Sequence, residues 1–298
     1  MMLPQISSAR GSHWSAPLWL VGVAVILVIA PRLLNAEPAD RILSIGGSVT
    51  EIVYALGEED RLVARDTTSL YPEAATQLPD VGYIRALASE GVLSVQPTLI
   101  ITEDGAGPPE TIEVLSEAAI PMITIPDAYS KDGVVAKILA VGNALDVPEK
   151  AAVLAKQTKA DIEAVEATVA SQIEAPKTVL FVLSTQGGRI TASGSGTAAH
   201  SIIQMAGGQN AISSFEGYKQ LTAEAISAAA PDVILMMDRD GDHSSTLDDL
   251  FAMPSLIATP AAQNGALVRM NGLLLLGFGP RTPEAVKMLN SALRSSSL

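Results

Sequence analysis

The 298-residue chain contains no cysteine, only 3 histidines, and few aromatic residues, which make up 4% of it. Without cysteine there can be no disulfide framework, no thiolate metal site and no lipidated N-terminal cysteine. No pair of histidines has the spacing of metal ligands, so we do not expect a zinc or manganese carrier. Both tryptophans, Trp14 and Trp19, stand near the N-terminus.

Positive charge is also scarce. Lys and Arg number 19 against 32 Asp and Glu, which gives a formal net charge of −13. Such an acidic chain is a poor binder of nucleic acid or anionic membranes, and an anionic ligand must be met by a few placed arginines. We expect a monomeric protein with no nucleic-acid partner.

A long apolar run occurs only at the front of the chain. Residues 17–30 are almost wholly apolar and follow a polar segment with one arginine and no acid. The run is shorter than the ~20 residues that a membrane-spanning helix needs. We therefore predict a secretory signal at residues 1–36, cleaved after Ala36, in preference to an uncleaved anchor. The expected location is a Gram-negative periplasm, and the formal charge then goes from −13 to −15, because two arginines and no acid are lost.

The chain lacks the common catalytic motifs. It contains no G-x-S-x-G, no G-x-x-x-x-G-K-[ST], and no G-x-G-x-x-G after a strand. The sequence L-G-F-G-P-R at residues 276–281 lacks the lysine of a phosphate loop, and we interpret it as a turn into the final helix. We predict that the protein is not an enzyme. The alternative is a periplasmic enzyme of Rossmann-like build, either a hydrolase or an oxidoreductase.

Two parts of the chain repeat each other. A predicted strand at 41–45 leads into a helix at 49–56, and a strand at 178–183 leads, through a glycine- and serine-rich loop, into a helix at 197–205. L-A-S-E-G-V-L-S-V-Q-P-T-L-I, from Leu87, matches L-T-A-E-A-I-S-A-A-A-P-D-V-I, from Leu221, with Glu seven residues before Pro in both. The repeat predicts an α/β fold of two Rossmann-like lobes with central parallel sheets. Chance similarity of two ordinary helix-to-strand units is the alternative.

A single long helix is predicted between the halves. Segment 146–175 has no glycine, and from Pro148 to Ile173 its apolar residues recur at mostly helical spacing. At 1.5 Å per residue such a helix is roughly 40 Å long. We expect it to join an N-terminal lobe at 37–145 to a C-terminal lobe at 176–298, with a ligand cleft between them.

One short stretch, L-P-D-V-G-Y-I-R-A-L-A-S-E at residues 78–90, contains the candidate ligand group. Gly82 lets the backbone turn. In extended backbone Tyr83 and Arg85 point to the same face, and a fixed positive charge favours the phenolate over the phenol. Phenolate is a hard ligand for ferric iron, and tyrosinate is a known axial ligand of haem. The alternative is a half-buried loop tyrosine beside a solvated arginine.

The chain resembles the periplasmic haem-binding proteins of bacterial haem ABC importers, whose two lobes are joined by one long helix. The matching motifs occur in family order: S-I-G-G-S-V-T-E-I-V-Y-A-L-G, D-T-T-S-L-Y-P, V-G-Y-x-R, G-T-A-A, A-G-G-Q-N-A and L-G-F-G-P-R. The V-G-Y-x-R block is the most specific, whereas L-A-S-E and P-D-V-I are shared by vitamin B12 and siderophore binders. The resemblance implies capture of ferric haem (hemin) and its delivery to an inner-membrane ABC permease dimer with its ATPase. A siderophore or cobalamin is the alternative ligand.

The resemblance assigns roles to individual residues. The tyrosine of V-G-Y is the family's iron ligand, which carries onto Tyr83, and the arginine that follows carries onto Arg85. Some members line the cleft with a second-lobe arginine, and Arg239 looks like its counterpart. Other members supply a histidine where this chain has Thr185 and Gln186, so no second iron ligand is evident.

Other candidate ligands are less specific. Tyr71, in S-L-Y-P, is the rival iron ligand, but it has no arginine two residues on. We interpret it as a stacking wall for a flat ligand, because aromatic faces attract flat apolar molecules. His200 and His243 are isolated in the sequence and are interpreted as core or solvent residues.

A matched pair of glutamates remains. Glu90 and Glu224 occupy equivalent places in the repeat. In the family that the chain resembles, the matching glutamates are docking points for the permease. The alternative is that both are helix-start carboxylates, which the helix dipole favours.

Overall fold

The computed structural model describes residues 41–172, 175–238 and 246–295. The predicted signal at 1–36, Arg239 and His243 therefore lie outside the described residues. Among the residues described, no helix combines the length and the apolar character that crossing a membrane requires.

The first lobe is built on a parallel four-stranded sheet of order β2-β1-β3-β4. β1 is buried along its whole length, as expected of a central strand covered on both faces. The strands are β1 (Ile42–Ile45), β2 (Leu62–Arg65), β3 (Leu99–Glu103) and β4 (Met122–Ile125). The helices are α1 (Gly47–Ala55), α2 (Ser89–Ser94), α3 (Pro109–Glu117) and α4 (Lys131–Ala144), with short 3₁₀ turns at Glu59–Arg61 and Glu73–Gln77.

The second lobe has a larger sheet of order β10-β9-β5-β6-β8, with β7 paired to β5. Its strands are β5 (Thr178–Ser184), β6 (Ile190–Ser193), β7 (Gln209–Asn210), β8 (Tyr218–Leu221), β9 (Val233–Asp238) and β10 (Leu267–Asn271). Its helices are α6 (Ala198–Met205), α7 (Ala223–Ala229), α8 (Leu247–Phe251), α9 (Pro260–Gln263), α10 (Gly272–Leu276) and α11 (Thr282–Ser295), with a 3₁₀ turn at Gln186–Gly188. β7, β9 and β10 continue the predicted parallel sheet, and β6 and β8 add antiparallel strands to it.

The segment between β5 and Gly196 differs from the prediction of a loop. It contains β6, which pairs with both β5 and β8. Ile190 and Ala192 alternate into the core and give this short strand its buried face. The surrounding glycines and serines hid that alternation in the sequence.

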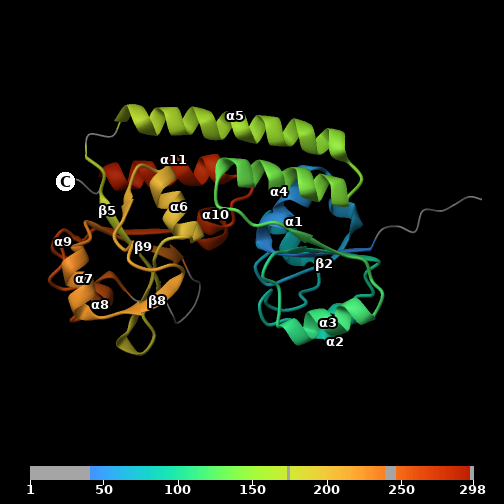
Figure 1. Ribbon diagram of the computed structural model, residues 1–298, viewed down its shortest axis with the longest axis horizontal. Coiled ribbons are helices and arrows are strands. Elements are labelled where there is room, and N and C mark those ends of the chain that lie inside the picture. Colours follow the sequence, from blue (N-terminus) through green and yellow to red (C-terminus); the bar gives the residue numbers. More distant parts are fainter. Residues whose placement is uncertain (1–40, 173–174, 239–245, 296–298) are drawn as a thin grey trace, which may run out of the picture. The chain divides into compact units, whose positions relative to one another are not determined.

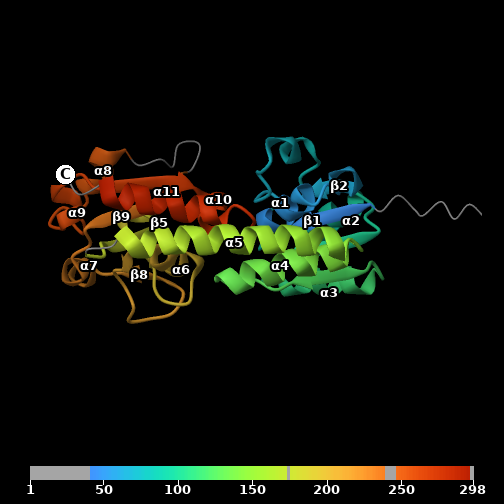
Figure 2. The same cartoon turned by 90° about the horizontal axis from the view of Figure 1, so that it is seen from above.

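Helix α5 (Pro148–Gln172) joins the two lobes and is 25 residues long, or roughly 37 Å at 1.5 Å per residue. It lies along α4 and α11, as both views show (Figures 1 and 2). Its buried residues recur every three or four positions over most of its length, which gives a narrow stripe facing those helices: Ala151, Ala155, Thr158, Ile162 and Val169. The predicted fold of two α/β lobes joined by one long helix is confirmed.

Candidate functional site

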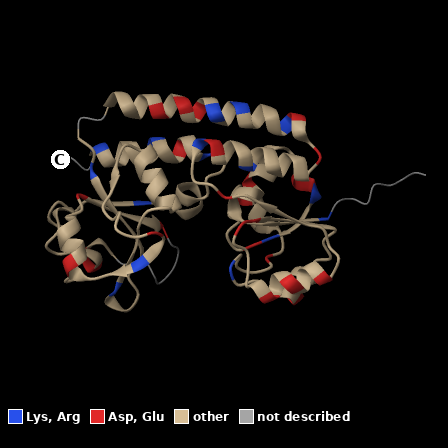
Figure 3. Ribbon diagram, in the orientation of Figure 1, with Lys and Arg blue, Asp and Glu red and all other residues tan. Residues whose placement is uncertain are grey.

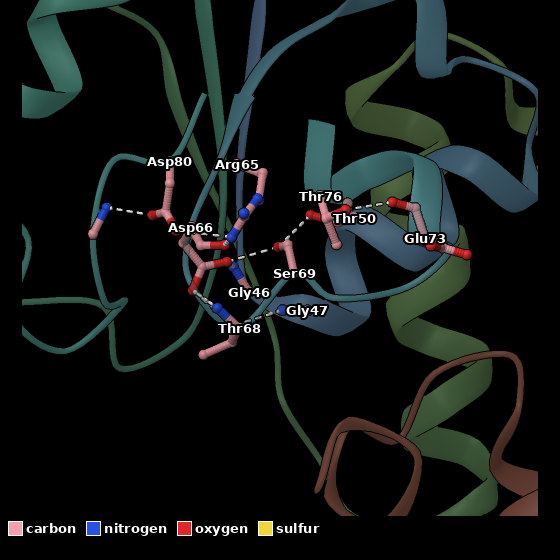
Figure 4. A network of polar contacts seen from close by, with 11 residues as sticks. Gly46, Gly47, Thr50, Arg65, Asp66, Thr68, Ser69, Glu73, Thr76 and Asp80 are labelled. Atoms are coloured by element: carbon pink, nitrogen blue, oxygen red, sulfur yellow. Dashed lines mark hydrogen bonds and ion pairs between the residues drawn. The ribbon is translucent and has the colours of Figure 1, made fainter. Parts of the chain in front are cut away.

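The loop after β2 is fixed by Asp66, which is fully buried (Figure 4). Its carboxylate accepts hydrogen bonds from the Gly46 N–H at 3.0 Å, from the Thr68 N–H and hydroxyl, and from the Ser69 hydroxyl. Because every bond ties the loop to itself or to the start of α1, the backbone leading to Tyr71 has one defined course.

The candidate ligand Tyr83 follows a neighbouring loop. Arg65 forms an ion pair of 2.8 Å with Asp80, and the Thr67 N–H donates to the Gly82 carbonyl at 3.0 Å. Gly82 has φ of 102°, a backbone conformation that favours glycine. These bonds hold the backbone that carries Tyr83 beside the loop fixed by Asp66, and 47% of Tyr83 is exposed.

One geometric expectation for this stretch is wrong. The backbone from Tyr83 to Ala86 is a turn rather than an extended segment, because the Ala86 N–H donates to the Tyr83 carbonyl at 2.7 Å. The alternation of a strand therefore does not direct the side chains of Tyr83 and Arg85 to one face. Arg85 is exposed, and its guanidinium lies close to Gly105: a Cβ placed on that glycine would be 3.7 Å from the Nη1 of Arg85.

The charge of Arg85 acts on a phenol of the other lobe, that of Tyr218 on β8. Burial raises the pKa of Tyr218, and it outweighs the hydrogen bonds from Thr197 and Ala199 and the charge of Arg85, which favour the phenolate. The Tyr218 ring lies edge-on to Phe181, 6.3 Å between centroids. The charge of Arg85 thus reaches a phenol of the other lobe, for which the sequence offers no local signal.

Tyr129 is a second half-buried phenol, and it is kept neutral. Its ring packs at 5.4 Å from that of Phe278, and burial, followed by the charge of Asp127, raises its pKa to about 12. A phenol that stays protonated at physiological pH is a wall or a hydrogen-bonding group rather than an anionic ligand. Tyr54 is also half-buried and packs against the core.

The Tyr71 ring meets an arginine that the sequence analysis did not single out. The guanidinium of Arg281 lies over the ring, with Cζ 3.4 Å from its centroid. Arg281 also donates to the Glu51 carboxylate, from Nη2 at 2.8 Å and from its backbone N–H at 3.1 Å. One face of Tyr71 is therefore covered, and the stacking wall predicted from the sequence is limited to the other face and the ring edge.

A second ion cluster centres on Lys137, whose side chain is fully buried. Its ammonium lies within hydrogen-bonding distance of four acceptors: Glu103 at 2.6 Å, Asp127 at 2.7 Å, the Ser48 hydroxyl at 3.0 Å and the Gly277 carbonyl at 3.1 Å. The lysine thus connects the ends of β3 and β4 to the turn between α10 and α11. That turn was predicted from the sequence, but its contacts with the first lobe were not.

His200 was the other histidine considered as a ligand. His200 is in the first turn of α6, and its Nδ1 lies 3.2 Å from the amide nitrogen of Asn210. Within the described ranges, no group of three or more His, Cys, Asp or Glu side chains is arranged to hold a metal ion. His200 therefore has a hydrogen-bond partner on β7.

Glu90 and Glu224 are both exposed, in the first turns of α2 and α7. Hydrogen bonds from its own backbone N–H and from the Thr222 hydroxyl lower the pKa of Glu224. Figure 3 shows both charges mixed along α5, whereas α2, α3 and α7 carry acidic side chains only. In Figure 1, α2 and α7 lie on the side turned away from α5.

Comparison with known proteins gives one family, and the similar proteins include binders of haem and of vitamin B12. The sequence model described as periplasmic binding protein matches residues 42–272. The periplasmic haem-binding protein BhuT, solved in complex with two haems, is 40% identical, with a TM-score of 0.82 over 86% of this chain and 98% of that one. RhuT from Roseiflexus sp. RS-1, a periplasmic haem-binding protein in apo form, is 36% identical, with a TM-score of 0.83 over 87% and 99%. A vitamin B12-binding protein of Yersinia pseudotuberculosis is 28% identical over 244 residues, 81% of this chain and 84% of the relative. The resemblance predicted from the sequence motifs is confirmed.

Proposed function

The chain belongs to the periplasmic binding protein family, and from this membership we propose that it captures ferric haem in the periplasm and delivers it to an ABC importer. The observation that carries the proposal is the 40% identity to a haem-binding protein over 86% of this chain. The identity to the vitamin B12-binding relative is lower, at 28%. Cobalamin, the ligand named for that relative, is the second candidate.

The residues around Tyr83 suit a flat ferric macrocycle with carboxylate side groups. In the proposed complex, the exposed Tyr83 phenol coordinates iron as phenolate, because ferric iron prefers a hard anionic oxygen. Arg85, also exposed, is available to a propionate, and the free side of Tyr71 offers an aromatic surface. Arg239 is proposed to line the cleft from the second lobe.

The first prediction concerns hemin itself. Apoprotein without its signal segment is expected to form a coloured one-to-one complex with hemin, with a ferric high-spin spectrum, because a single phenolate gives a weak axial field. Absorption titration at micromolar hemin measures it, with cyanocobalamin as the matched test of the second candidate. An unchanged hemin spectrum, together with saturable binding of cyanocobalamin, would identify cobalamin rather than haem as the ligand.

Delivery is proposed to use Glu90 and Glu224. The two carboxylates are exposed, one on each lobe, and each is proposed to meet an arginine of one permease subunit. Exposed charges of this kind act mainly on encounter and orientation, and salt screens them.

The second prediction tests this docking. Glu90→Ala combined with Glu224→Ala is expected to leave hemin affinity intact and to abolish stimulation of the transporter ATPase in membrane vesicles. The matched control is Glu149→Ala with Glu284→Ala, which removes two other exposed first-turn carboxylates. The docking role would be contradicted if the Glu90→Ala, Glu224→Ala variant stimulated the ATPase normally, or if the control variant lost stimulation to the same extent. The two glutamates would then be only helix-start residues.

A further inference from the structure

The Tyr71 ring is held by residues of both lobes. Its ring belongs to the first lobe, and the guanidinium that covers it belongs to the residue that precedes α11 in the second lobe. Arg281 is pinned in turn by the carboxylate of Glu51, whose side chain is only 5% exposed. Three segments far apart in the sequence therefore fix the plane of one ring.

The Arg281 guanidinium interacts with the Tyr71 ring as well as with Glu51. Its Nε is buried and, within the described residues, has no hydrogen-bond acceptor. A buried donor without an acceptor is costly, unless another favourable contact compensates for it. The contact available here is the Tyr71 face at 3.4 Å, where a cation is attracted by the ring quadrupole.

Tyr71 remains open on its other side. Although the guanidinium lies against one face, 43% of the residue is exposed, so the exposure belongs to the opposite face and the ring edge. Glu51 neutralises the arginine, which leaves a fixed aromatic surface without a net charge beneath it. A surface ordered before the ligand arrives loses less conformational entropy on binding.

We propose that Arg281 is a positioning residue for ligand binding: it holds the Tyr71 ring as a ready-made stacking platform for a flat aromatic macrocycle, and it ties that platform to the second lobe. The proposal rests on the proposed function for the identity of the macrocycle. It differs from a purely structural pin between the lobes in one respect, because a pin would act on stability and leave ligand affinity alone.

The test separates stacking from iron coordination by using protoporphyrin IX, which has no iron, beside hemin. Arg281→Met is expected to weaken protoporphyrin IX binding about 5- to 30-fold, the range that a cation–π contact supports. Tyr71→Ala should cause a similar loss. The double variant should bind protoporphyrin IX no more weakly than the single variant with the lower affinity, because both changes remove the same platform. Tyr83→Phe should weaken hemin binding far more than protoporphyrin IX binding, because only hemin has an iron for the phenolate to coordinate.

Two further variants keep the test sharp. Arg281→Lys retains a charge for Glu51 but loses the planar stack, so we expect an affinity between those of the unmodified protein and Arg281→Met. Arg294→Met, which changes an exposed arginine in the last turn of α11, is the matched control and should bind normally. Thermal melts of all variants report stability separately.

Three outcomes would overturn the platform. In the first, Arg281→Met binds protoporphyrin IX as tightly as the unmodified protein does; Arg281→Lys takes its place if Arg281→Met does not fold. In the second, the fold-losses in affinity caused by Arg281→Met and Tyr71→Ala multiply in the double variant. Absence of binding of both porphyrins by the unmodified protein would overturn the proposed function, and the platform with it. The binding curve of the unmodified protein therefore tells the two failures apart.

Discussion

Hemin affinity is expected to fall by on the order of 100-fold or more when Tyr83 is replaced by phenylalanine. Removing groups that merely orient metal ligands costs about 10- to 100-fold, so the loss of the ligand atom itself should cost at least as much. The fold should survive, because Tyr83 is 47% exposed and the substitution deletes only an oxygen. Exposed positions of this kind usually change stability by no more than about 0.5 kcal/mol.

The spectrum identifies which phenol binds the iron. Tyr83→Phe should abolish the tyrosinate charge-transfer band of the hemin complex, and Tyr71→Phe should retain it, since it keeps the ring on which Arg281 stacks. Tyr218→Phe should retain the band as well, because burial raises the pKa of Tyr218 and so disfavours the phenolate that would bind iron. If the band persists in Tyr83→Phe and disappears in one of the other two variants, the iron ligand is that tyrosine.

Local patterns in the sequence were sufficient for most of the framework. β1 was predicted because an apolar run bounded by glycine is a local feature, and α5 because its helical spacing continues over 25 residues. The turn at Tyr83 was missed because one hydrogen bond, from the Ala86 N–H, decides between turn and strand. Neither residue type nor spacing records that choice.

The charged clusters were missed for a different reason. Arg281 meets a carboxylate 230 positions away, and Lys137 a carbonyl 140 positions away. The only local signal was composition: Glu51 stands among buried apolar residues of α1, and Lys137 in an apolar run of α4. Lys and Glu are almost never fully buried unless paired, but the residue that pairs with each cannot be identified from its neighbours in the sequence.

Lys137 has the largest expected effect on stability. Its fully buried ammonium faces two carboxylates whose side chains are 17% and 18% exposed, those of Glu103 and Asp127. Replacing a buried pair by apolar groups can be neutral, whereas removing one partner leaves an uncompensated charge and costs about 3–5 kcal/mol. Here a single removal leaves two such charges, at the ends of neighbouring strands β3 and β4.

Lys137→Met is therefore expected to lower the melting temperature by on the order of 10 °C, from about 3–5 kcal/mol in a chain of this size. Methionine has a similar length, so the loss comes from charge rather than from an empty cavity. Lys131→Met is the matched control on the same helix: Lys131 pairs with Glu163 and Glu166 near the surface, and exposed pairs contribute about 1 kcal/mol or less.

The pH dependence of this loss separates charge from packing. In Lys137→Met the folded chain gains by protonating a carboxyl of the Glu103–Asp127 pair, because that removes the repulsion between them. The folded variant then binds more protons than its unfolded chain, so its stability relative to the parent rises as pH falls. Thermal melts from pH 8 to pH 5 should show the gap in melting temperature narrowing. Adding Glu103→Gln and Asp127→Asn should make the remaining difference in melting temperature independent of pH. If the difference between Lys137→Met and the parent does not change with pH, the loss of stability comes from packing alone.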